Sequence, residues 1–353
     1  MKCVLVVGTG TIGEPLIGLL SRMRDEFGMD EVLFHKRTPL RDEYAKVESL
    51  ISQGAKLVVD KERTQEFREM GHKVSLDFAT ALERSDVVID CTPAGNANKE
   101  KYYSKLEGTK TFIAQGSEKG FGAPYGYMIN NEMLNQNPEY VQVVSCNTHS
   151  IARMCRVLSE KNKFISGDFV CIRRANDPSQ DTGFIASPTV GKHDDDLFGT
   201  HHARDVYDLL ETVSSGSYTN LSSSAMKTNS QYMHAIRFSI TVEGKVSSEA
   251  ALTAFRNDKM IALTHHKSAN RVFSFGRDHG FYGRIYNQVV INESSVATFS
   301  NGENTKIVGF AFTPQDGNSL LSSAAAAISS ICKNKENLPY LYTHLDSLLR
   351  NNI

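Results

Sequence analysis

Cys146 lies between Ser145 and the polar pair Asn147-Thr148, directly after an apolar run at residues 140–144 that is typical of a buried strand. The polar residues that follow indicate the start of a helix. A thiol at this point faces unpaired backbone N–H groups and the positive end of the helix, which favour the thiolate. An ionised sulfur can attack a carbonyl carbon, so the sequence predicts a nucleophilic cysteine.

A buried structural thiol is the simpler interpretation of a lone cysteine, because free cysteines are among the most buried residues. The polar neighbours of Cys146 favour the nucleophile instead. The other five cysteines lie mostly in apolar segments, and we assign structural roles to Cys3, Cys91, Cys155, Cys171 and Cys332. Six cysteines without paired spacings indicate a reducing compartment, and we expect a cytoplasmic protein.

A glycine-rich segment between an expected strand at residues 2–7 and a helix has the spacing of a dinucleotide-binding turn. In such a turn the first glycine permits the bend, the second lets phosphate approach the backbone, and the third packs helix against strand. A purely structural turn is the alternative. Together with a nucleophilic sulfur, a nicotinamide cofactor would allow an aldehyde to be oxidised through a thioester. The cofactor residues expected here are Gly8, Gly10, Thr11, Ile12 and Gly13.

The residues around the second expected strand bear on the choice of cofactor. A site that selects NAD usually places an acid at the end of this strand, where it binds the ribose 2′-hydroxyl. The strand at residues 31–35 has its acid, Glu31, at the start, and Lys36 and Arg37 follow its end. These cations are either solvated surface charges or ligands of a 2′-phosphate. We therefore expect NADP to be accepted and preferred, with NAD as the other cofactor.

Strands and helices alternate through the first part of the chain, which predicts an α/β fold with a parallel, doubly wound sheet of the Rossmann type. The carboxyl ends of such strands form the ligand crevice. Thr92 and Gly116 lie just after two of these ends, and we assign both to the cofactor site. The expected strands are residues 2–7, 31–35, 73–75, 86–91 and 111–114.

After Cys146, long strands replace this alternation. Asn301-Gly302 is a hairpin signal between two of them, and residues 175–202 are expected to form a loop. We predict an α+β catalytic domain with a mixed or antiparallel sheet. The expected strands are residues 164–174, 234–242, 271–275, 285–292, 295–299 and 306–313, and the expected helices are 151–160, 318–332 and 338–351.

A chain of 353 residues is too long for one ordinary core. We expect a dinucleotide-binding domain at residues 1–144, a catalytic domain at 145–316, and C-terminal helices at 317–353 that pack back onto the first domain. A net charge of −1 gives no general attraction to nucleic acid or to an anionic membrane. No apolar run of the sequence is long enough to span a bilayer.

These motifs occur in the order of one family's landmarks. The chain resembles the archaeal-type glyceraldehyde-3-phosphate dehydrogenases through most of its length. The resemblance implies a phosphorylating, reversible oxidation of glyceraldehyde 3-phosphate to 1,3-bisphosphoglycerate in glycolysis and gluconeogenesis, with NADP or NAD and usually in a homotetramer. The matching segments are residues 8–13, 86–93, 115–116, 143–148, 173–175, 177–178, 201–202 and 227–234.

The chain departs from the family pattern in three respects, the last of which concerns two segments. The family usually has a second threonine where this chain has His149, and Gly-Pro where it has Ala203-Arg204. The segment after Arg284 and the tail beyond Asn318 also match poorly. These differences bear on substrate contacts more than on the fold.

The proposed chemistry needs a base, because hydride cannot easily leave a neutral alcohol. Histidine has a suitable pKa, and the resemblance places His234 in this role, among polar residues at 229–231. Since Arg173 and Arg174 end an expected strand, they should point to opposite faces, and at most one should face the crevice. The resemblance favours Arg174 as the cofactor or phosphate contact.

The substrate phosphate and the attacking inorganic phosphate need cations and hydroxyl donors near Cys146. With the resemblance as a guide, we assign substrate binding to Ser145, Asn147, Thr148, His201 and His202, and we add Gln315 to the cofactor site. Lys192 and His149 are weaker candidates for the anions.

Other functions are weighed beside this one. A related semialdehyde dehydrogenase or a non-phosphorylating aldehyde dehydrogenase would use the same cysteine chemistry. A cofactor-binding protein with a role in nucleic-acid binding is disfavoured, because the chain has no basic stripe. Metal binding by His201-His202 or His265-His266 is disfavoured, because adjacent histidines seldom share an ion and no ligand-spaced cysteines or carboxylates accompany them.

Overall fold

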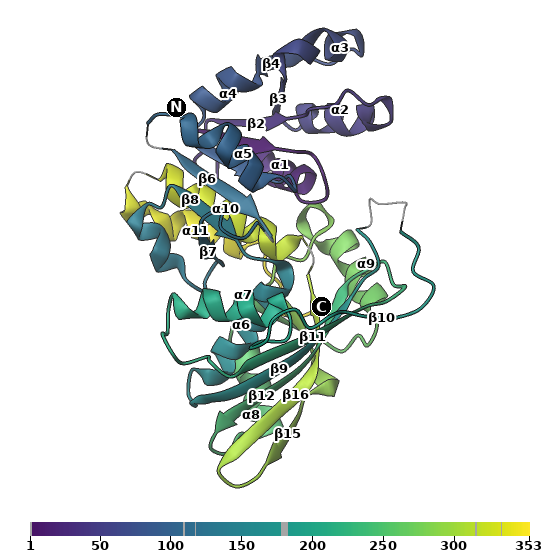
Figure 1. Ribbon diagram of the computed structural model, residues 1–353, viewed down its shortest axis with the longest axis vertical. Helices are drawn as coiled ribbons and strands as arrows, with labels where there is room; N and C mark the ends of the chain where they lie inside the picture. Colours follow the sequence, from purple (N-terminus) through teal and green to yellow (C-terminus); the bar gives the residue numbers. More distant parts are fainter. Residues whose placement is uncertain (1, 109, 117, 178–182, 315, 333) are drawn as a thin grey trace. The chain divides into compact units, whose positions relative to one another are not determined.

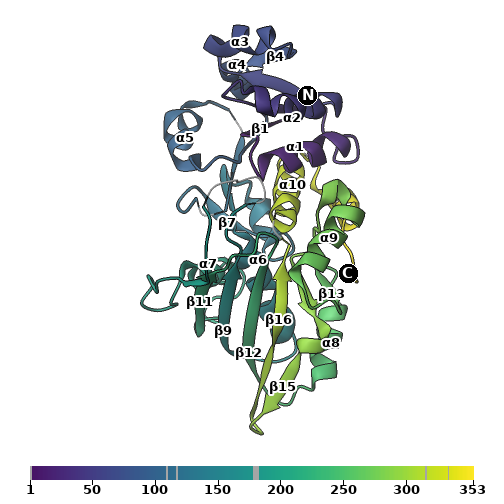
Figure 2. The same ribbon diagram turned by 90° about the vertical axis from the view of Figure 1, so that its right-hand side faces the viewer.

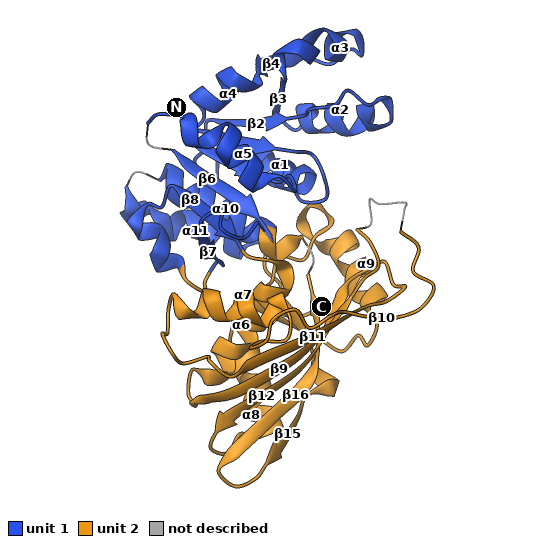
Figure 3. Cartoon of the chain, in the orientation of Figure 1, with its two compact units in different colours: residues 1–127, 131–143, 320–347 blue, residues 128–130, 144–319, 348–353 orange. Residues whose placement is uncertain are grey.

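The computed structural model describes residues 2–353 except 109, 117, 178–182, 315 and 333. The chain divides into two compact units (Figure 3). Unit 1 comprises residues 1–127, 131–143 and 320–347, and unit 2 comprises residues 128–130, 144–319 and 348–353.

Unit 1 is built on an eight-stranded sheet in the order β4-β3-β2-β1-β5-β6-β8-β7, and every neighbouring pair is parallel (Figure 1). This confirms the predicted Rossmann-like sheet. Parallel strands that are covered on both faces become continuous apolar runs, and β1 is buried along its whole length. The strands are β1 (Cys3–Val7), β2 (Glu31–His35), β3 (Lys56–Val59), β4 (Val74–Asp77), β5 (Val87–Asp90), β6 (Thr111–Gln115), β7 (Ala123–Tyr125) and β8 (Tyr140–Val143).

Helices connect the strands from β1 to β6, as parallel pairing requires. They are α1 (Gly13–Arg22), α2 (Tyr44–Ser52), α3 (Thr64–Glu69), α4 (Phe78–Arg84) and α5 (Gly95–Lys101). Unit 1 also contains α11 (Leu338–Asp346), from the end of the chain. Helix α10 (Gly317–Ile331) belongs to unit 1 from Leu320 onward. A core of buried side chains from β1, β2, β5, β6 and α4 holds the sheet, and it includes Leu5, Leu33, Val88, Phe112 and Leu82.

Unit 2 has a mixed eight-stranded sheet, which confirms the predicted α+β arrangement. Its order is β10-β11-β9-β12-β16-β14-β13, with β15 paired antiparallel to β16 (Figure 2). Pairs β9–β11 and β13–β14 are parallel, and the other pairs are antiparallel. The strands are β9 (Phe164–Arg173), β10 (Thr189–Val190), β11 (Leu221–Lys227), β12 (His234–Glu243), β13 (Ile261–Thr264), β14 (Val289–Asn292), β15 (Ala297–Ser300) and β16 (Asn304–Thr313).

One face of this sheet is covered by helices. Helix α6 (Cys146–Ser159) packs against β9, β12, β14 and β16, α7 (His201–Glu211) against β11, and α8 (Ser248–Arg256) against β13. Buried residues alternate along β12, where Ile236, Phe238 and Ile240 belong to the core shared with these helices. His234 has the same parity, so it lies on the face that α6 covers. The position of His234 is thus set by the pleat of β12.

The strand expected at residues 271–275 is wrong, because this segment lies in helix α9 (Ala269–His279). The apolar residues Val272, Phe273 and Phe275 favoured a strand. However, Ala269, Val272, Phe273 and Gly276 have the i, i+3, i+4, i+7 spacing of one helix face, and Val272 and Gly276 are buried there. Short apolar runs fit either period, and packing decides between them.

Several elements differ in smaller ways from the expectation. The loop expected at residues 175–202 contains the short strand β10, and α7 already begins at His201. Strand β14 begins at Val289, four residues after the expected start. The elements that were not expected from sequence also include α2, β3, β7, α7, α8, β11 and β13. Among the described residues, no helix combines the length and the apolar character that crossing a bilayer requires.

Candidate active site

Cys146 is the first residue of α6, and the residue before it caps the helix. Ser145 has an extended backbone, with φ −66° and ψ 160°, and its hydroxyl accepts a hydrogen bond from the backbone N–H of Thr148 at 3.3 Å. The hydroxyls of Ser145 and Thr148 also lie 2.8 Å apart. The half-buried thiol therefore stands at the amino end of a 14-residue helix, as the sequence predicted.

The ionisation of this thiol differs from the expectation. Burial raises the pKa of Cys146 to about 11, although the charge of Arg174, the backbone N–H of Asn147 and the charge of Arg173 act to lower it. The carboxylate of Asp316 adds to the rise. The helix start and the cations do favour the thiolate, but desolvation outweighs them. Without ligands the thiol is therefore protonated near neutral pH.

His234, the first residue of β12, belongs to the same cluster. Its Nδ1 accepts a hydrogen bond from the backbone N–H of Arg174 at 3.0 Å. Because Nδ1 accepts, the neutral ring carries its hydrogen on Nε2. Burial, followed by the charges of Arg174 and Arg173, holds the pKa of His234 well below its usual value. The ring is therefore neutral near pH 7.

The two arginines contribute unequally. Arg174 is buried, and its guanidinium forms an ion pair with Asp177. Arg173 is the last residue of β9 and is half-buried. Both charges lower the pKa of Cys146, with the larger effect from Arg174. The positive charge near the thiol thus comes from both residues.

His202 is the most unusual polar residue of the cluster. It is 3% exposed, and neither ring nitrogen has a hydrogen-bond partner within the part of the chain that the structure describes. Burial, with smaller effects from His201 and Arg173, lowers the pKa of His202 to about 3. The ring centroids of His201 and His202 are 4.0 Å apart. Since buried polar atoms are normally hydrogen-bonded, this ring is well suited to meet a ligand.

Asn147, which was assigned to the substrate, and two residues that differ from the family pattern, His149 and Arg204, make contacts within the protein. The side-chain oxygen of Asn147 accepts a hydrogen bond from the Thr313 hydroxyl at 3.1 Å. His149 is fully buried, its Nδ1 lies 3.0 Å from the backbone oxygen of Ser145, and burial lowers its pKa to about 4. The guanidinium of Arg204 forms an ion pair with Asp195 and stacks over the ring of Phe198. His149 and Arg204 therefore stabilise local structure.

In unit 1, the glycine turn has the shape that its spacing predicted. Gly8 has φ +96°, a conformation that side chains disfavour. A Cβ on Gly13 would lie 2.1 Å from the backbone oxygen of Gly8, whereas a Cβ on Gly10 would meet nothing within 4 Å. Gly13 thus permits close packing of α1 on the turn, and Gly10 leaves its backbone approachable.

This contrast predicts different stabilities for two alanine variants. Gly13→Ala is expected to lower the free energy of unfolding by at least about 2 kcal/mol, because backbone must move to admit the methyl group. Gly10→Ala should change it by less than about 0.5 kcal/mol, because the methyl group enters open space. Urea unfolding followed by circular dichroism measures both. Equal destabilisation by the two variants would contradict this role of Gly13.

The turn opens onto a cavity of about 600 Å³ at the carboxyl ends of β1, β2 and β5. Four residues assigned from sequence line it, namely Gly8, Lys36, Arg37 and Thr92. Gly116, with φ +66°, follows β6, and its N–H donates to the Val143 oxygen at 2.9 Å. Sequence reasoning missed further lining residues, which come from the end of β3 and from α4 and α5: Asp60, Phe78, Asn98, Lys101 and Tyr102.

The two cations after β2 have different surroundings. Lys36 is buried, and its ammonium group pairs with Glu43, which also binds Lys46 at 2.7 Å. Arg37 is exposed where it lines the cavity. Arg37 is therefore better placed than Lys36 to meet an added anion.

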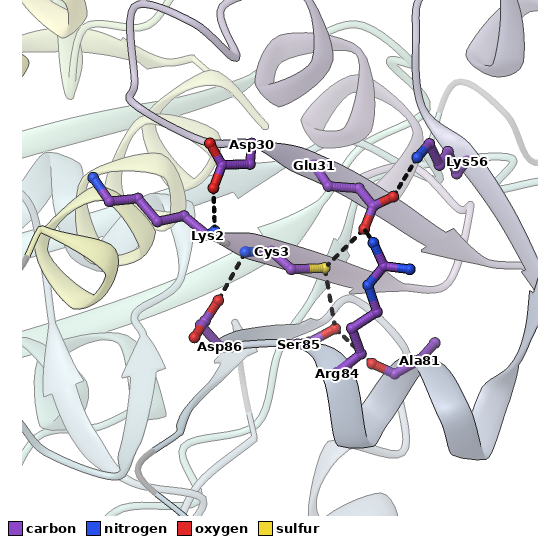
Figure 4. Close-up of polar contacts among 9 residues, drawn as sticks. All are labelled: Lys2, Cys3, Asp30, Glu31, Lys56, Ala81, Arg84, Ser85 and Asp86. Carbon is purple, nitrogen blue, oxygen red and sulfur yellow. Dashed lines mark hydrogen bonds and ion pairs between the residues drawn. The ribbon is translucent and has the colours of Figure 1, made fainter.

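Glu31 cannot supply the carboxylate of an NAD-selective site. It opens β2 at the amino edge of the sheet, and its side chain, 4% exposed, pairs with Lys56 and Arg84 (Figure 4). The Cys3 sulfur lies 3.7 Å from the same carboxylate, and the Cys3 N–H donates to Asp86 at 2.8 Å. These contacts of Glu31 and Cys3 hold the ends of neighbouring strands together, which is consistent with a structural role for Cys3.

Gln315 lies outside the described residues. Within those residues, no group of three or more histidine, cysteine, aspartate or glutamate side chains is arranged to hold a metal ion.

Comparisons with known proteins give a consistent result. No protein-family model matches the chain. The chain is 29% identical over 315 residues to glyceraldehyde-3-phosphate dehydrogenase of Sulfolobus acidocaldarius, covering 84% of both chains. It is 28% identical to that of Methanocaldococcus jannaschii, covering 84% of this chain and 85% of the relative. The corresponding protein of Thermococcus kodakarensis is 27% identical, with 81% and 82% covered.

Proposed function

Since this chain belongs to the archaeal-type glyceraldehyde-3-phosphate dehydrogenases, we propose that it oxidises glyceraldehyde 3-phosphate to 1,3-bisphosphoglycerate, reversibly and with inorganic phosphate, in glycolysis and gluconeogenesis. The observation that carries the proposal is a cluster of three residues in unit 2. Cys146 begins a helix, the charge of Arg174 lowers its pKa, and the backbone N–H of Arg174 donates a hydrogen bond to His234. A thiol, a guanidinium and a neutral imidazole are the groups that thioester formation on an anionic aldehyde requires.

Cys146 is the proposed nucleophile. Its thiol first loses its proton to solvent, and the thiolate adds to the aldehyde carbon to form a hemithioacetal oxyanion. After oxidation the sulfur holds the acyl group as a thioester. A phosphate oxygen then attacks the thioester carbon, the carbon–sulfur bond breaks, and the thiolate leaves as the acyl phosphate is released. Because burial raises the pKa of Cys146 to about 11, proton loss is costly at neutral pH.

His234 is the proposed acid–base residue, and its hydrogen bond defines what the resting ring can do. With Nδ1 accepting from the Arg174 backbone, Nε2 carries the ring hydrogen and is a donor. A donor at this position would stabilise the oxyanion of the hemithioacetal. The base expected from the sequence would require the Arg174 contact to break. We therefore propose that His234 acts first as a hydrogen-bond donor.

The anions are assigned to the cations and histidines of the cluster. Arg174 and Arg173 supply positive charge near the thiol, and His202 has buried ring nitrogens whose hydrogen-bonding capacity is unused among the described residues. His201 starts α7 next to it. We propose that these residues hold the phosphate groups, with Ser145, Asn147 and Thr148 shaping the helix start that presents the thiol.

The cavity in unit 1 fits a nicotinamide dinucleotide. It lies at the carboxyl edge of a parallel sheet, where a glycine with φ +96° bends the chain and a second glycine leaves its backbone open. Gly8 to Gly13, Thr92 and Gly116 would hold the cofactor here, and Arg174 and Gln315 are proposed contacts from the rest of the chain. When bound, the nicotinamide supplies the hydride acceptor.

We propose NADP as the preferred cofactor, with Arg37 as the ligand of its 2′-phosphate. Arg37→Glu should raise the NADP Michaelis constant by at least about tenfold, because a charged hydrogen bond is replaced by repulsion. The NAD Michaelis constant should change far less. Initial rates with each cofactor measure this difference. Arg63→Glu, an equal charge change at an exposed ion pair outside the cavity lining, is the control. Equal effects of Arg37→Glu on both cofactors would reject the assignment.

One assay tests the proposed reaction against its relatives. Initial rates are measured with glyceraldehyde 3-phosphate and with aspartate semialdehyde, each with both cofactors, with and without inorganic phosphate. The proposal expects glyceraldehyde 3-phosphate as substrate and a rate that depends on phosphate. Turnover without phosphate indicates a non-phosphorylating enzyme, and turnover of the semialdehyde alone indicates a semialdehyde dehydrogenase.

The assembly and the compartment are further proposals. All six cysteines are free thiols, which supports a reducing compartment, and we propose the cytoplasm. The family resemblance supports a homotetramer. Light scattering of the purified protein measures the subunit number.

A further inference from the structure

The segment between β16 and α10 carries a buried acid that the proposed reaction does not use. Asp316 is 7% exposed and has φ +71°, a left-handed conformation that aspartate and asparagine tolerate better than most residues. Sequence reasoning did not select it. A buried acid in this conformation persists only where the surroundings fix it.

The neighbouring residues hold Asp316 in place. A Cβ on Gly317 would lie 1.7 Å from the Ile285 backbone oxygen, so the segment is pressed against the chain that follows Arg284. The Asn318 side-chain amide donates to the backbone oxygen of Cys146 at 3.0 Å. The segment that carries Asp316 is therefore tied directly to the residue that carries the thiol.

The charges around Asp316 come from two arginines and one acid. The Nε atom of Arg284 lies 3.4 Å from its carboxylate. Burial raises the pKa of Asp316, while Arg284 and Arg174 lower it and Asp177 raises it. Asp316, Arg174 and Arg284 also line one small cavity of about 100 Å³. The carboxylate and the proposed nucleophile thus share Arg174.

We propose that Asp316 is a positioning residue that restrains the reactivity of Cys146, because its negative charge repels the thiolate and competes with it for Arg174. The inference rests on the proposed function, in which Cys146 is the nucleophile. Its consequence is a thiol that stays protonated near neutral pH in the unliganded protein.

The other groups around the thiol act on its pKa in both directions. Burial of Cys146 raises its pKa, Arg174, the Asn147 N–H and Arg173 lower it, and Asp316 raises it. The imidazoles of this region, His149, His202 and His234, have lowered pKa values and are neutral near pH 7. The Cys171 thiol, which senses the charge of Cys146, has its pKa raised by burial to about 12. Asp316 is thus the negative group of this set, and its removal leaves burial as the effect that opposes the cations.

The experiment uses the unliganded full chain and measures Cys146 without any turnover. The thiolate is titrated by its ultraviolet absorbance, with the same protein carrying Cys146→Ser subtracted as background. Alkylation of Cys146 by iodoacetamide, located by peptide mapping, gives a second reading. Asp316→Asn preserves shape and tolerates the left-handed backbone, so it removes the charge with little disturbance of the fold.

Asp316→Asn should move the titration of Cys146 to lower pH and speed its alkylation at pH 8 by about threefold to tenfold, since one pKa unit is a tenfold change in thiolate. Arg284→Met should act in the opposite direction, because the carboxylate loses its neutralising partner. Asp278→Asn, at an exposed ion pair on α9, is the control and should change neither reading.

Three results would overturn the proposal. The first is an unchanged titration of Cys146 in a natively folded Asp316→Asn variant, and the second is faster alkylation of Cys146 without a shift of its titration. The third is faster alkylation in Arg284→Met, which would indicate that loosened local structure, and not charge, controls access to the thiol. None of these readings depends on the substrate, so a failure here is distinct from a failure of the proposed reaction.

Discussion

Cys146→Ser is expected to lower the phosphate-dependent oxidation of glyceraldehyde 3-phosphate by at least about a thousandfold. Serine occupies the same first position of α6 and is nearly as large as cysteine, but its hydroxyl is a much weaker nucleophile. No thioester can form on it. Initial rates at saturating cofactor, substrate and inorganic phosphate measure the loss.

A matched substitution separates chemistry from packing. Cys155 lies in the same helix, is fully buried, and has its pKa raised by burial alone. Cys155→Ser should therefore reduce stability but preserve most of the turnover. Binding of NADP to Cys146→Ser, measured by calorimetry, should be retained, because the cavity assigned to the cofactor is lined by unit 1. Full turnover by Cys146→Ser would end the assignment of this sulfur as the nucleophile.

Burial patterns explain which parts of the fold could be predicted from sequence. Strands β1, β2 and β5 are buried at every position, and each contains a run of at least three consecutive apolar residues that locates it to within about one residue. Helix α7 was missed, although Ala203, Val206 and Leu210 lie on its buried face. Its polar start, which contains the two histidines, concealed the helical spacing.

The sequence suggests the proposed nucleophile and acid–base residue, but it does not show how burial and distant charges shift their pKa values. The position of Cys146 at a helix start follows from local sequence, and so does the expected pull toward the thiolate. Burial depends on contacts with distant segments, and it reverses that expectation. Asp316 and Arg284 are far from Cys146 in sequence, and no local motif marks them. The effects of burial and of distant charges on the pKa of Cys146 could therefore be found only from the structure.

Substitution of His234 is expected to lower kcat strongly, and comparison of alanine with glutamine at this position tests its role. His234→Ala is expected to lower kcat by about 10²- to 10³-fold, the usual loss when one donor to an oxyanion is removed. His234→Gln should recover at least about tenfold of this loss, because its amide N–H can donate near the position of Nε2. If His234 acts mainly as a base, the two variants should be equally impaired.

The pH dependence of the wild-type enzyme distinguishes the same two roles. Because the pKa of His234 is held well below its usual value, the ring stays neutral between about pH 6 and 9, and its protonation should produce no acid limb in this range. The thiol of Cys146 has a pKa of about 11, so kcat/KM should rise with pH across the same interval as the thiolate fraction grows. An acid limb near pH 6.5 that disappears in His234→Gln would instead assign the ring as the base, with its Nδ1 released from the Arg174 backbone.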